Sequence, residues 1–269
     1  MTTTADLLGT IVAATRTAVA VREKATPLDV LEQQVRRRPR GDEFAAALRS
    51  GPAPRVIAEC KRRSPSRGVL RETYDPPSHA VAYARAGAAA ISVLTEPAFF
   101  DGALEHLADV RASVDIPLLR KDFIVDPYQI VETAVLGADA VLLIVRALDD
   151  EMLRSLMASA RGRGLAALVE VHDASELTRA LDAGADIVGV NSRNLRTLTM
   201  DPGVLDRVIE KVPEHAIAVA ESGIRDTADL DRLSRIGYHA FLVGERLIAA
   251  ADPGAALREL RGELRRGRR

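Results

Sequence analysis

Short apolar runs alternate with stretches of helical pattern from residue 56 onward. Eight such runs occur, with starts 20 to 34 residues apart, at 56–60, 90–95, 117–121, 140–144, 167–171, 187–191, 216–220 and 240–244. Continuous apolar strands separated by helices are typical of a parallel sheet that helices cover. Eight such units predict an α/β fold in which the sheet closes into a (β/α)8 barrel, or TIM barrel.

An internal repeat supports closure of the sheet. GAAAISVL from Gly87, GADAVLLI from Gly137, GADIVGVN from Gly184 and GYHAFLVG from Gly237 each join a helix end to a strand, at intervals of 50, 47 and 53 residues. Two strand–helix units repeated four times are the pattern of a barrel built from quarter-turns. These glycines are expected to take the left-handed conformation that ends a helix.

Residues 1–50 are predicted to form an N-terminal helical extension and residues 51–269 the barrel, so that the chain has a single domain overall. Apolar positions from Leu7 to Val12 have helical spacing, and Pro27 suits the first turn of a second helix that extends to Val35. A third short helix is expected at 42–49. The C-terminal LRELRGELRRGRR predicts a helix with a solvated basic end, which is favoured over a nucleic-acid role for this segment.

Composition narrows the class of protein further. The chain has 269 residues, 47% of them hydrophobic, enough to bury the core of one barrel. Its net charge of −1 gives no electrostatic reason to expect nucleic acid or an acidic membrane as a partner. One cysteine, no signal-peptide pattern and no apolar stretch of transmembrane length predict a cytoplasmic protein. The sequence leaves a monomer or a weak homo-oligomer open.

The segment VIAECKRRSPSRG, from Val56 to Gly68, carries the first candidate chemistry. Side chains alternate along a strand, so Glu59 and Lys61 share one face and Cys60 takes the other. An acid and a base at a strand end are costly to bury, although a structural ion pair would also place them there. Lysine is rare in this chain, with four against 33 arginines, and two of the four, Lys61 and Lys121, fall at predicted strand ends.

Further polar residues lie where the other strands end, and in a barrel the carboxyl ends of all strands meet at one mouth. By the same alternation Lys121 shares a face with Phe123, and Asn191 shares one with Arg193. The candidates at this mouth are Glu59, Lys61, Lys121, Glu170, Asn191, Arg193 and Glu221. Charges that only solubilise a barrel normally lie on its helices, so this convergence favours a functional site.

A glycine follows each of the last two strands, in ESGI at 221–224 and LVGE at 242–245. Backbone N–H groups at a helix start bind phosphate, and the loops after strands seven and eight are the usual place in these barrels. Gly223 and Gly244 are therefore predicted to lie at a phosphate site. A phosphorylated small molecule is the expected substrate.

The motifs resemble those of indole-3-glycerol-phosphate synthases over about residues 55–250. The matching segments are ECKRRSPSRG at 59–68, LLRKDFIVDPYQI at 118–130, LVEVHDASEL at 168–177, VNSRNLRT at 190–197, AESGI at 220–224 and FLVGE at 241–245. Cys60 departs from the aliphatic residue usual in the family, and 192–200 lacks an expected second asparagine and acidic stretch. By strand alternation Cys60 faces the helices, and the changes at 192–200 flank Asn191 and Arg193 without altering either residue.

The resemblance implies ring closure of 1-(2-carboxyphenylamino)-1-deoxyribulose 5-phosphate to indole-3-glycerol phosphate, with loss of CO₂ and water, in tryptophan biosynthesis. It assigns Lys121 as general acid and Glu170 as general base, with Glu59 and Lys61 orienting the substrate. Ser64, Phe123, Asn191 and Arg193 match residues that surround the substrate, and Glu221 matches a supporting carboxylate. Ser222, Gly223, Gly244 and Glu245 match the family's phosphate cradle. The resemblance leaves open which lysine acts in which proton transfer. No metal-ligand spacing or nucleotide fingerprint occurs in the sequence, so no cofactor or metal is expected.

Three other classes remain open at this point. A Schiff-base aldolase also places a lysine in a barrel mouth beside a phosphate site, and a flavin-dependent oxidoreductase uses the same cradle. A non-catalytic binder of a sugar phosphate would keep the cradle without the acid and base. An isomerase of the same pathway uses a cysteine at the end of strand one, whereas Cys60 is expected to point away from the mouth.

Overall fold

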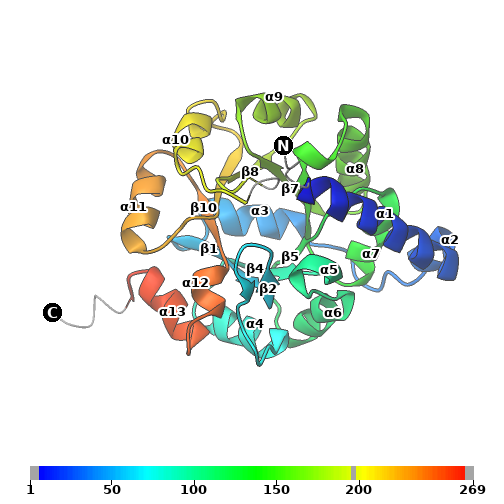
Figure 1. Ribbon diagram of the computed structural model, residues 1–269, viewed down its shortest axis with the longest axis horizontal. Coiled ribbons are helices and arrows are strands. Elements are labelled where there is room, and N and C mark those ends of the chain that lie inside the picture. Colours follow the sequence, from blue (N-terminus) through cyan, green and yellow to red (C-terminus); the bar gives the residue numbers. More distant parts are fainter. Residues whose placement is uncertain (1–5, 195–197, 264–269) are drawn as a thin grey trace, which may run out of the picture.

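A closed barrel of eight parallel strands, ringed by helices, forms the body of the molecule (Figure 1). The computed structural model describes residues 6–194 and 198–263, so part of the 190–197 motif and the basic end at 264–269 lie outside the described residues. The strands, in their order around the barrel, are β1 (Arg55–Cys60), β10 (Ala240–Val243), β9 (Ile217–Glu221), β8 (Ile187–Asn191), β7 (Ala166–Val171), β6 (Ala140–Ile144), β5 (Leu118–Lys121) and β4 (Ala90–Leu94).

The predicted (β/α)8 barrel is confirmed, and each strand begins and ends within two residues of its predicted run. The helices that connect successive strands are α4 (Pro76–Arg85), α5 (Pro97–Phe100), α6 (Leu104–Ser113), α7 (Pro127–Val135), α8 (Asp150–Gly162), α9 (Ala174–Asp182), α10 (Gly203–Ile209) and α11 (Thr227–Arg235). Two helices, α12 (Glu245–Ile248) and α13 (Pro253–Leu260), follow the last strand. A 3-10 turn, η1 (Val145–Ala147), precedes α8, and a small hairpin of β2 (Arg63–Ser64) and β3 (Gly68–Val69) lies in the loop after β1. The four repeat glycines have φ values of 78°, 82°, 86° and 116°, as predicted for helix ends.

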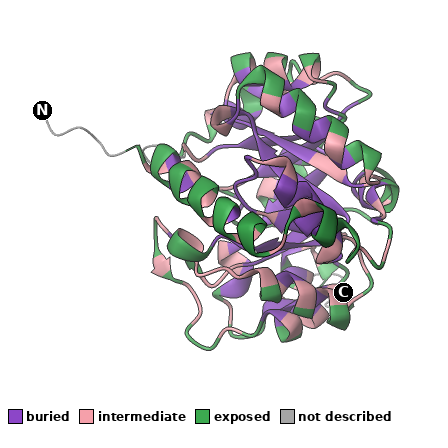
Figure 2. Ribbon diagram, turned by 90° about the vertical axis from the view of Figure 1, so that its right-hand side faces the viewer, coloured by how far each residue is buried: buried purple, intermediate pink, exposed green. Residues whose placement is uncertain are grey.

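Alternating side chains divide the core into two layers. Val56, Ala58 and Cys60 of β1 pack outward against the helices, whereas Ile57 packs inside the barrel. Figure 2 shows buried strands surrounded by helices whose outer faces are exposed. None of the helices in residues 6–194 and 198–263 combines the length and apolar character that a bilayer crossing requires.

Three helices precede the barrel: α1 (Leu7–Ala25), α2 (Leu28–Glu32) and α3 (Gly41–Ser50). Helix α3 covers the amino ends of the strands, because Phe44 and Leu48 are fully buried in the inner layer. Helix α1 lies beside the opposite end and is held to α7 by an ion pair of 2.5 Å between Arg22 and Glu132. The proposed division of the chain at residue 50 stays a prediction.

The second helix is shorter than predicted, since it ends at Glu32 and leaves Val35 outside. The segment that follows is instead used to reach the base of the barrel. There Arg37 donates to the carboxylate of Asp139 over 2.8 Å, and the backbone N–H of Arg40 donates to the same oxygen over 2.9 Å. A continued helix would have carried these groups away from the fully buried Asp139.

Cys60 is expected to be chemically inert in the folded protein. It is fully buried between β1 and α4, and burial together with the nearby Glu59 carboxylate raises the pKa of its thiol. Cys60→Ala should cost about 1 kcal/mol of stability and change activity less than about twofold. Thiol labelling with and without denaturant measures this. Rapid labelling of the native protein, blocked by substrate, would contradict the predicted strand register.

Candidate active site

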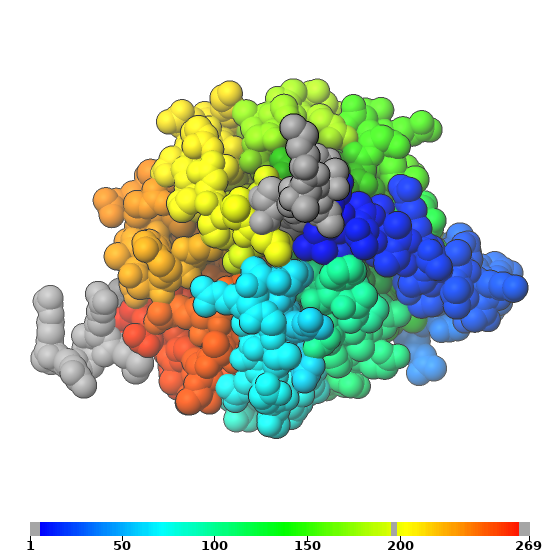
Figure 3. Space-filling view, in the orientation of Figure 1, coloured from blue at the N-terminus to red at the C-terminus, as the bar shows by residue number. Residues whose placement is uncertain are grey.

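A cavity of about 770 Å³ opens at the carboxyl ends of the barrel strands. In the space-filling view, α1, the loop after β1 and the loop after β8 gather around this end of the barrel (Figure 3). Every predicted site residue lines the cavity: Glu59, Lys61, Ser64, Lys121, Phe123, Glu170, Asn191, Arg193, Glu221, Ser222, Gly223, Gly244 and Glu245. Strand ends and side-chain alternation indicated that Glu59 and Glu221, 162 positions apart, would meet, whereas Ser64, Phe123, Ser222 and Glu245 were indicated by the resemblance.

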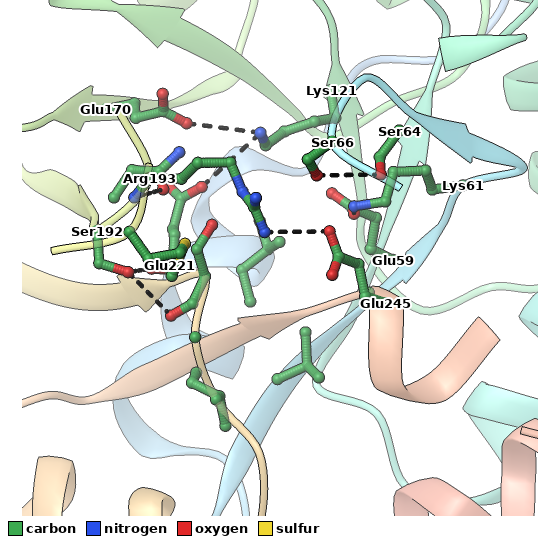
Figure 4. Close-up of a pocket in the computed structure, with 18 of the residues that line it drawn as sticks. Glu59, Lys61, Ser64, Ser66, Lys121, Glu170, Ser192, Arg193, Glu221 and Glu245 are labelled. Carbon is green, nitrogen blue, oxygen red and sulfur yellow. Dashed lines mark hydrogen bonds and ion pairs between the residues drawn. The ribbon is translucent and has the colours of Figure 1, made fainter. Parts of the chain in front are cut away.

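Lys121, Glu170 and Glu221 form a charged centre in the floor of the cavity (Figure 4). The Lys121 Nζ lies 3.5 Å from the Glu170 Oε2 and 3.8 Å from the Glu221 Oε2. Glu170 and Glu221 are almost fully buried, with 0% and 1% exposure. They come from β7 and β9, and their approach depends on Gly189 of the intervening β8.

Gly189 leaves the space that the Glu221 carboxylate occupies. A Cβ atom at this position would lie 2.1 Å from the Glu221 Oε1, a distance that no real side chain tolerates. In the strand register, Gly189 is also paired with Glu170. A glycine in the interior of a strand marks a close approach, and here it allows two carboxyl groups to meet above one lysine.

Burial and neighbouring charges move the pKa values of this centre in different directions. Burial lowers the pKa of Lys121, but the carboxylates of Glu170, Glu221 and Glu59 outweigh it, so the net pKa is raised. Burial raises the pKa of Glu170, but Lys121 and His172 outweigh it, so the net pKa is lowered. For Glu221, burial and the Glu170 carboxylate both raise the pKa well above its usual value. These shifts favour the charged forms of Lys121 and Glu170 and the neutral form of Glu221.

Glu59 and Lys61 form a second charged pair, on the β1 side of the cavity. The Lys61 Nζ lies 2.5 Å from the Glu59 Oε1, and both groups line the cavity, as the alternation of β1 predicts. A Cβ at Gly244 would lie 2.3 Å from the same Glu59 oxygen. Gly244 therefore makes room for the Glu59 carboxylate as well as opening its own backbone to the cavity.

One wall of the cavity is apolar, and most of it was not predicted from the sequence. Leu7, Leu8 and Ile11 of α1 lie there with Phe100 of α5 and the predicted Phe123. The rings of Phe100 and Phe123 have centroids 6.1 Å apart. The apolar spacing of α1 was visible in the sequence, but nothing in it indicated that this face would cover the mouth.

The predicted phosphate cradle also lines the cavity, with one difference from the expectation. Ser222 and Gly223 are both left-handed, with φ values of 63° and 76°, and Gly244 directly precedes α12. Gly223 does not start a helix, however, because α11 begins at Thr227 and its end is capped by the Asp226 side chain. The backbone turn at Ser222 and Gly223, rather than a helix end, faces the cavity there.

Glu245 is neutralised by arginines on two sides. Its Oε1 accepts a hydrogen bond of 3.1 Å from Arg193, and its Oε2 lies 3.1 Å from the Arg67 Nε. The backbone N–H of Arg193 donates in turn to the Asn191 side chain over 3.0 Å. Arg67 was not among the predicted site residues, because one arginine in the SPSRG turn gives no signal that separates it from the many other arginines of the chain.

A buried arginine supports the strand that carries Lys121. Arg120 is fully buried, and its guanidinium lies 3.0 Å from Asp122 and 3.1 Å from Glu132. Glu132 also binds Arg22 of α1, so this helix is tied to the strand beside the charged centre.

Within residues 6–194 and 198–263, no group of three or more His, Cys, Asp or Glu side chains is arranged to hold a metal ion.

A closed (β/α)8 barrel with an acid–base centre in its mouth defines a TIM-barrel enzyme. A family model described as indole-3-glycerol phosphate synthase matches residues 8–260. The chain belongs to this family. It is thereby a carboxy-lyase of tryptophan biosynthesis that acts on a phosphorylated small molecule.

Similar chains support the assignment. An indole-3-glycerol phosphate synthase from Parafrankia sp. (strain EAN1pec) is 51% identical over 238 residues, which cover 88% of each chain. One from Mycolicibacterium vanbaalenii is 49% identical over 257 residues, covering 95% of this chain and 94% of the relative. Solved structures of KGPDC from Streptococcus mutans and of a 3-hexulose-6-phosphate synthase have TM-scores of 0.60 and 0.61. They cover 79% and 77% of this chain and 98% of their own, and at 16% and 17% identity they show the fold alone.

Proposed function

We propose that the family's ring closure takes place in this cavity, with Lys121 as the general acid and Glu170 as the general base. The observation that carries the proposal is the contrast between two buried carboxyl groups beside one lysine. The pKa of Glu170 is lowered and that of Glu221 is raised. Glu170 is therefore the carboxyl group that can accept a proton, and Lys121, whose pKa is raised, carries a proton that it can donate.

The reaction needs these groups in sequence. As the anthranilate ring carbon attacks the C2′ carbonyl, Lys121 donates a proton to the oxygen that becomes a hydroxyl. Loss of CO₂ returns the electron pair of the broken bond to the ring. The C2′ hydroxyl then leaves as water after a second proton transfer, and Glu170 removes a proton from C1′, which makes the new five-membered ring aromatic. Glu221 in its neutral form adds no second negative charge beside Glu170.

The remaining site residues are proposed to bind and orient the substrate. The apolar wall with Phe123 fits the aromatic ring, and Ser64, Asn191 and Arg193 fit its carboxylate and the sugar hydroxyls. Ser222, Gly223, Gly244 and Glu245 form the phosphate side of the cavity. Glu59 and Lys61 orient the substrate between these two ends.

A Schiff-base mechanism is less well supported by the same geometry. A lysine nucleophile needs a lowered pKa, whereas the neighbouring acidic side chains, Glu170 foremost, raise the pKa of Lys121. Treating a mixture of enzyme and substrate with borohydride should therefore leave Lys121 unmodified. A reduced substrate adduct on Lys121, detected by mass spectrometry, would favour the aldolase-type chemistry.

Replacing Gly223 by valine should raise KM for the substrate roughly tenfold, about 1.4 kcal/mol of binding. A side chain at a φ of 76° is strained and would press on Met200, whose Cε lies 3.0 Å from the added Cβ. Gly184→Val is the matched control, because its φ of 86° imposes similar strain at the opposite end of β8. Steady-state kinetics, with inorganic phosphate as a competitor, measure the effect. A normal KM in Gly223→Val, or no competition at high millimolar phosphate, would mean that the cradle lies elsewhere.

We further propose that the protein works in the cytoplasm, as a monomer or weak homo-oligomer, without a nucleic-acid or membrane partner. The near-neutral net charge and the single buried cysteine support this setting.

A further inference from the structure

His172 is a buried titratable residue that the proposed reaction does not use. It lies in the turn between β7 and α9, two residues after Glu170, and its side chain is 4% exposed. The cavity lining does not include it, so it cannot touch a substrate bound there. Its position in the extended chain places its ring on the same side as the Glu170 carboxylate.

The imidazole ring lies between two carboxylates. Its Nε2 is 3.3 Å from the Glu170 Oε1, whereas Lys121 is on the other oxygen of Glu170. Its Nδ1 is 3.1 Å from the Glu176 Oε2, which also accepts a hydrogen bond of 2.8 Å from the His172 backbone N–H. The other oxygen of Glu176 is held by Arg146, at 2.5 Å. The ring is therefore fixed in place by the start of α9.

Each ring nitrogen of His172 faces a carboxylate oxygen. The Nδ1 contact with Glu176 has hydrogen-bond geometry, whereas the Nε2 and the Glu170 Oε1 are buried without a hydrogen-bond partner. The contact of 3.3 Å between these two atoms is therefore a charge attraction, which acts when the ring is protonated. The charged groups around this arrangement are Glu170 of β7, Lys121 of β5, Glu221 of β9, Glu176 and Asp173 at the start of α9, and Arg146 of η1. Arg146 shares its single positive charge between Glu176 and Asp173, and the His172 ring lies between Glu176 and Glu170.

We propose that His172 is a positioning residue for the reaction: held by Glu176 as an imidazolium, it keeps Glu170 ionised and its second oxygen turned toward Lys121. This inference rests on the proposed role of Glu170 as the general base. Glu170 and Glu221 share a buried site in which one proton can lie on either carboxyl group. A cation that lies beside Glu170 but not beside Glu221 favours the state in which Glu221 carries the proton. The lowered pKa of Glu170, to which His172 contributes after Lys121, agrees with this assignment.

His172→Gln keeps a polar side chain and removes the charge. We expect kcat near neutral pH to fall about tenfold and KM to change less than about twofold. Loss of a cation raises the pKa of Glu170, and the base is active only above that pKa. The acidic limb of the kcat profile should therefore move to higher pH by about one unit, and activity should recover as the pH rises.

Two further variants make the result specific. Glu176→Gln removes the carboxylate that holds the imidazolium, and should shift the limb in the same direction. The double variant should be no worse than His172→Gln alone, because both changes act through one interaction. His79→Gln is the matched control, since His79 is also buried but bonds to the backbone of Asp75 at the start of α4. Its profile should match the wild type.

An acidic limb at the wild-type position in both His172→Gln and Glu176→Gln would overturn the inference, as would a loss of kcat without a shift. If His172→Gln does not fold, the limb of Glu176→Gln decides. Glu170→Gln separates the two levels of the proposal. If that variant stays active, the proposed base is wrong; if it is inactive while His172→Gln behaves as wild type, only the role of His172 fails.

Discussion

Lys121→Met should lower turnover by ~10² to 10⁴-fold while leaving the protein folded. The methionine fills a similar volume but has no proton to donate to the substrate oxygen. It also removes the cation that lies within 4 Å of two buried carboxyl groups, at 3.5 and 3.8 Å. These groups can take up protons from solvent, so the fold is retained. Product formation measured with circular dichroism on the same sample tests both parts.

Lys211→Met is the matched control, because Lys211 is exposed and follows α10 at the other end of its strand–helix unit. It should keep wild-type turnover. If Lys121→Met retains more than about a tenth of the wild-type rate, Lys121 is not the principal general acid.

Glu170→Gln should produce a loss of similar size, ~10² to 10⁴-fold in kcat, with a smaller change in KM. The amide has the shape of the carboxylate but cannot accept the C1′ proton whose removal makes the new five-membered ring aromatic. The free energy of unfolding should stay the same or increase, because the substitution removes a desolvated negative charge whose burial costs energy. Chemical denaturation alongside steady-state kinetics measures the two effects separately.

Glu221→Gln provides the comparison, because burial and the Glu170 carboxylate raise the pKa of Glu221 and favour its neutral form, and the amide keeps a donor. Its loss of kcat should be clearly smaller than that of Glu170→Gln. The reverse order of the two losses would exchange the roles of the two residues.

The barrel and the members of its mouth could be predicted because both follow from local rules. Continuous apolar runs marked the strands, and alternation along each run assigned Glu59 and Lys61 to the cavity and Cys60 to the helix side. Ion pairing and burial agree with these faces. One register error in β1 would have reversed all three.

Features that depend on how distant segments meet could not be predicted. The role of Leu8 in the cavity wall depends on where α1 lies, and its attachment depends on Arg22 meeting Glu132 across 110 residues. His172 was within a recognised motif, but its two carboxylate partners become visible only when the turn after β7 is folded. Gly223 was expected to lie directly before a helix, but the capping residue of α11 is Asp226, so that the helix begins only at Thr227.

Indole fluorescence after mixing the purified protein with 1-(2-carboxyphenylamino)-1-deoxyribulose 5-phosphate tests the central claim most directly. Fluorescence is expected to grow with the wild-type protein and to stay near background with Lys121→Met and Glu170→Gln at equal concentration. A folded wild-type protein that produces no fluorescence, or variants that produce it at the wild-type rate, would contradict the proposed reaction and its acid–base pair.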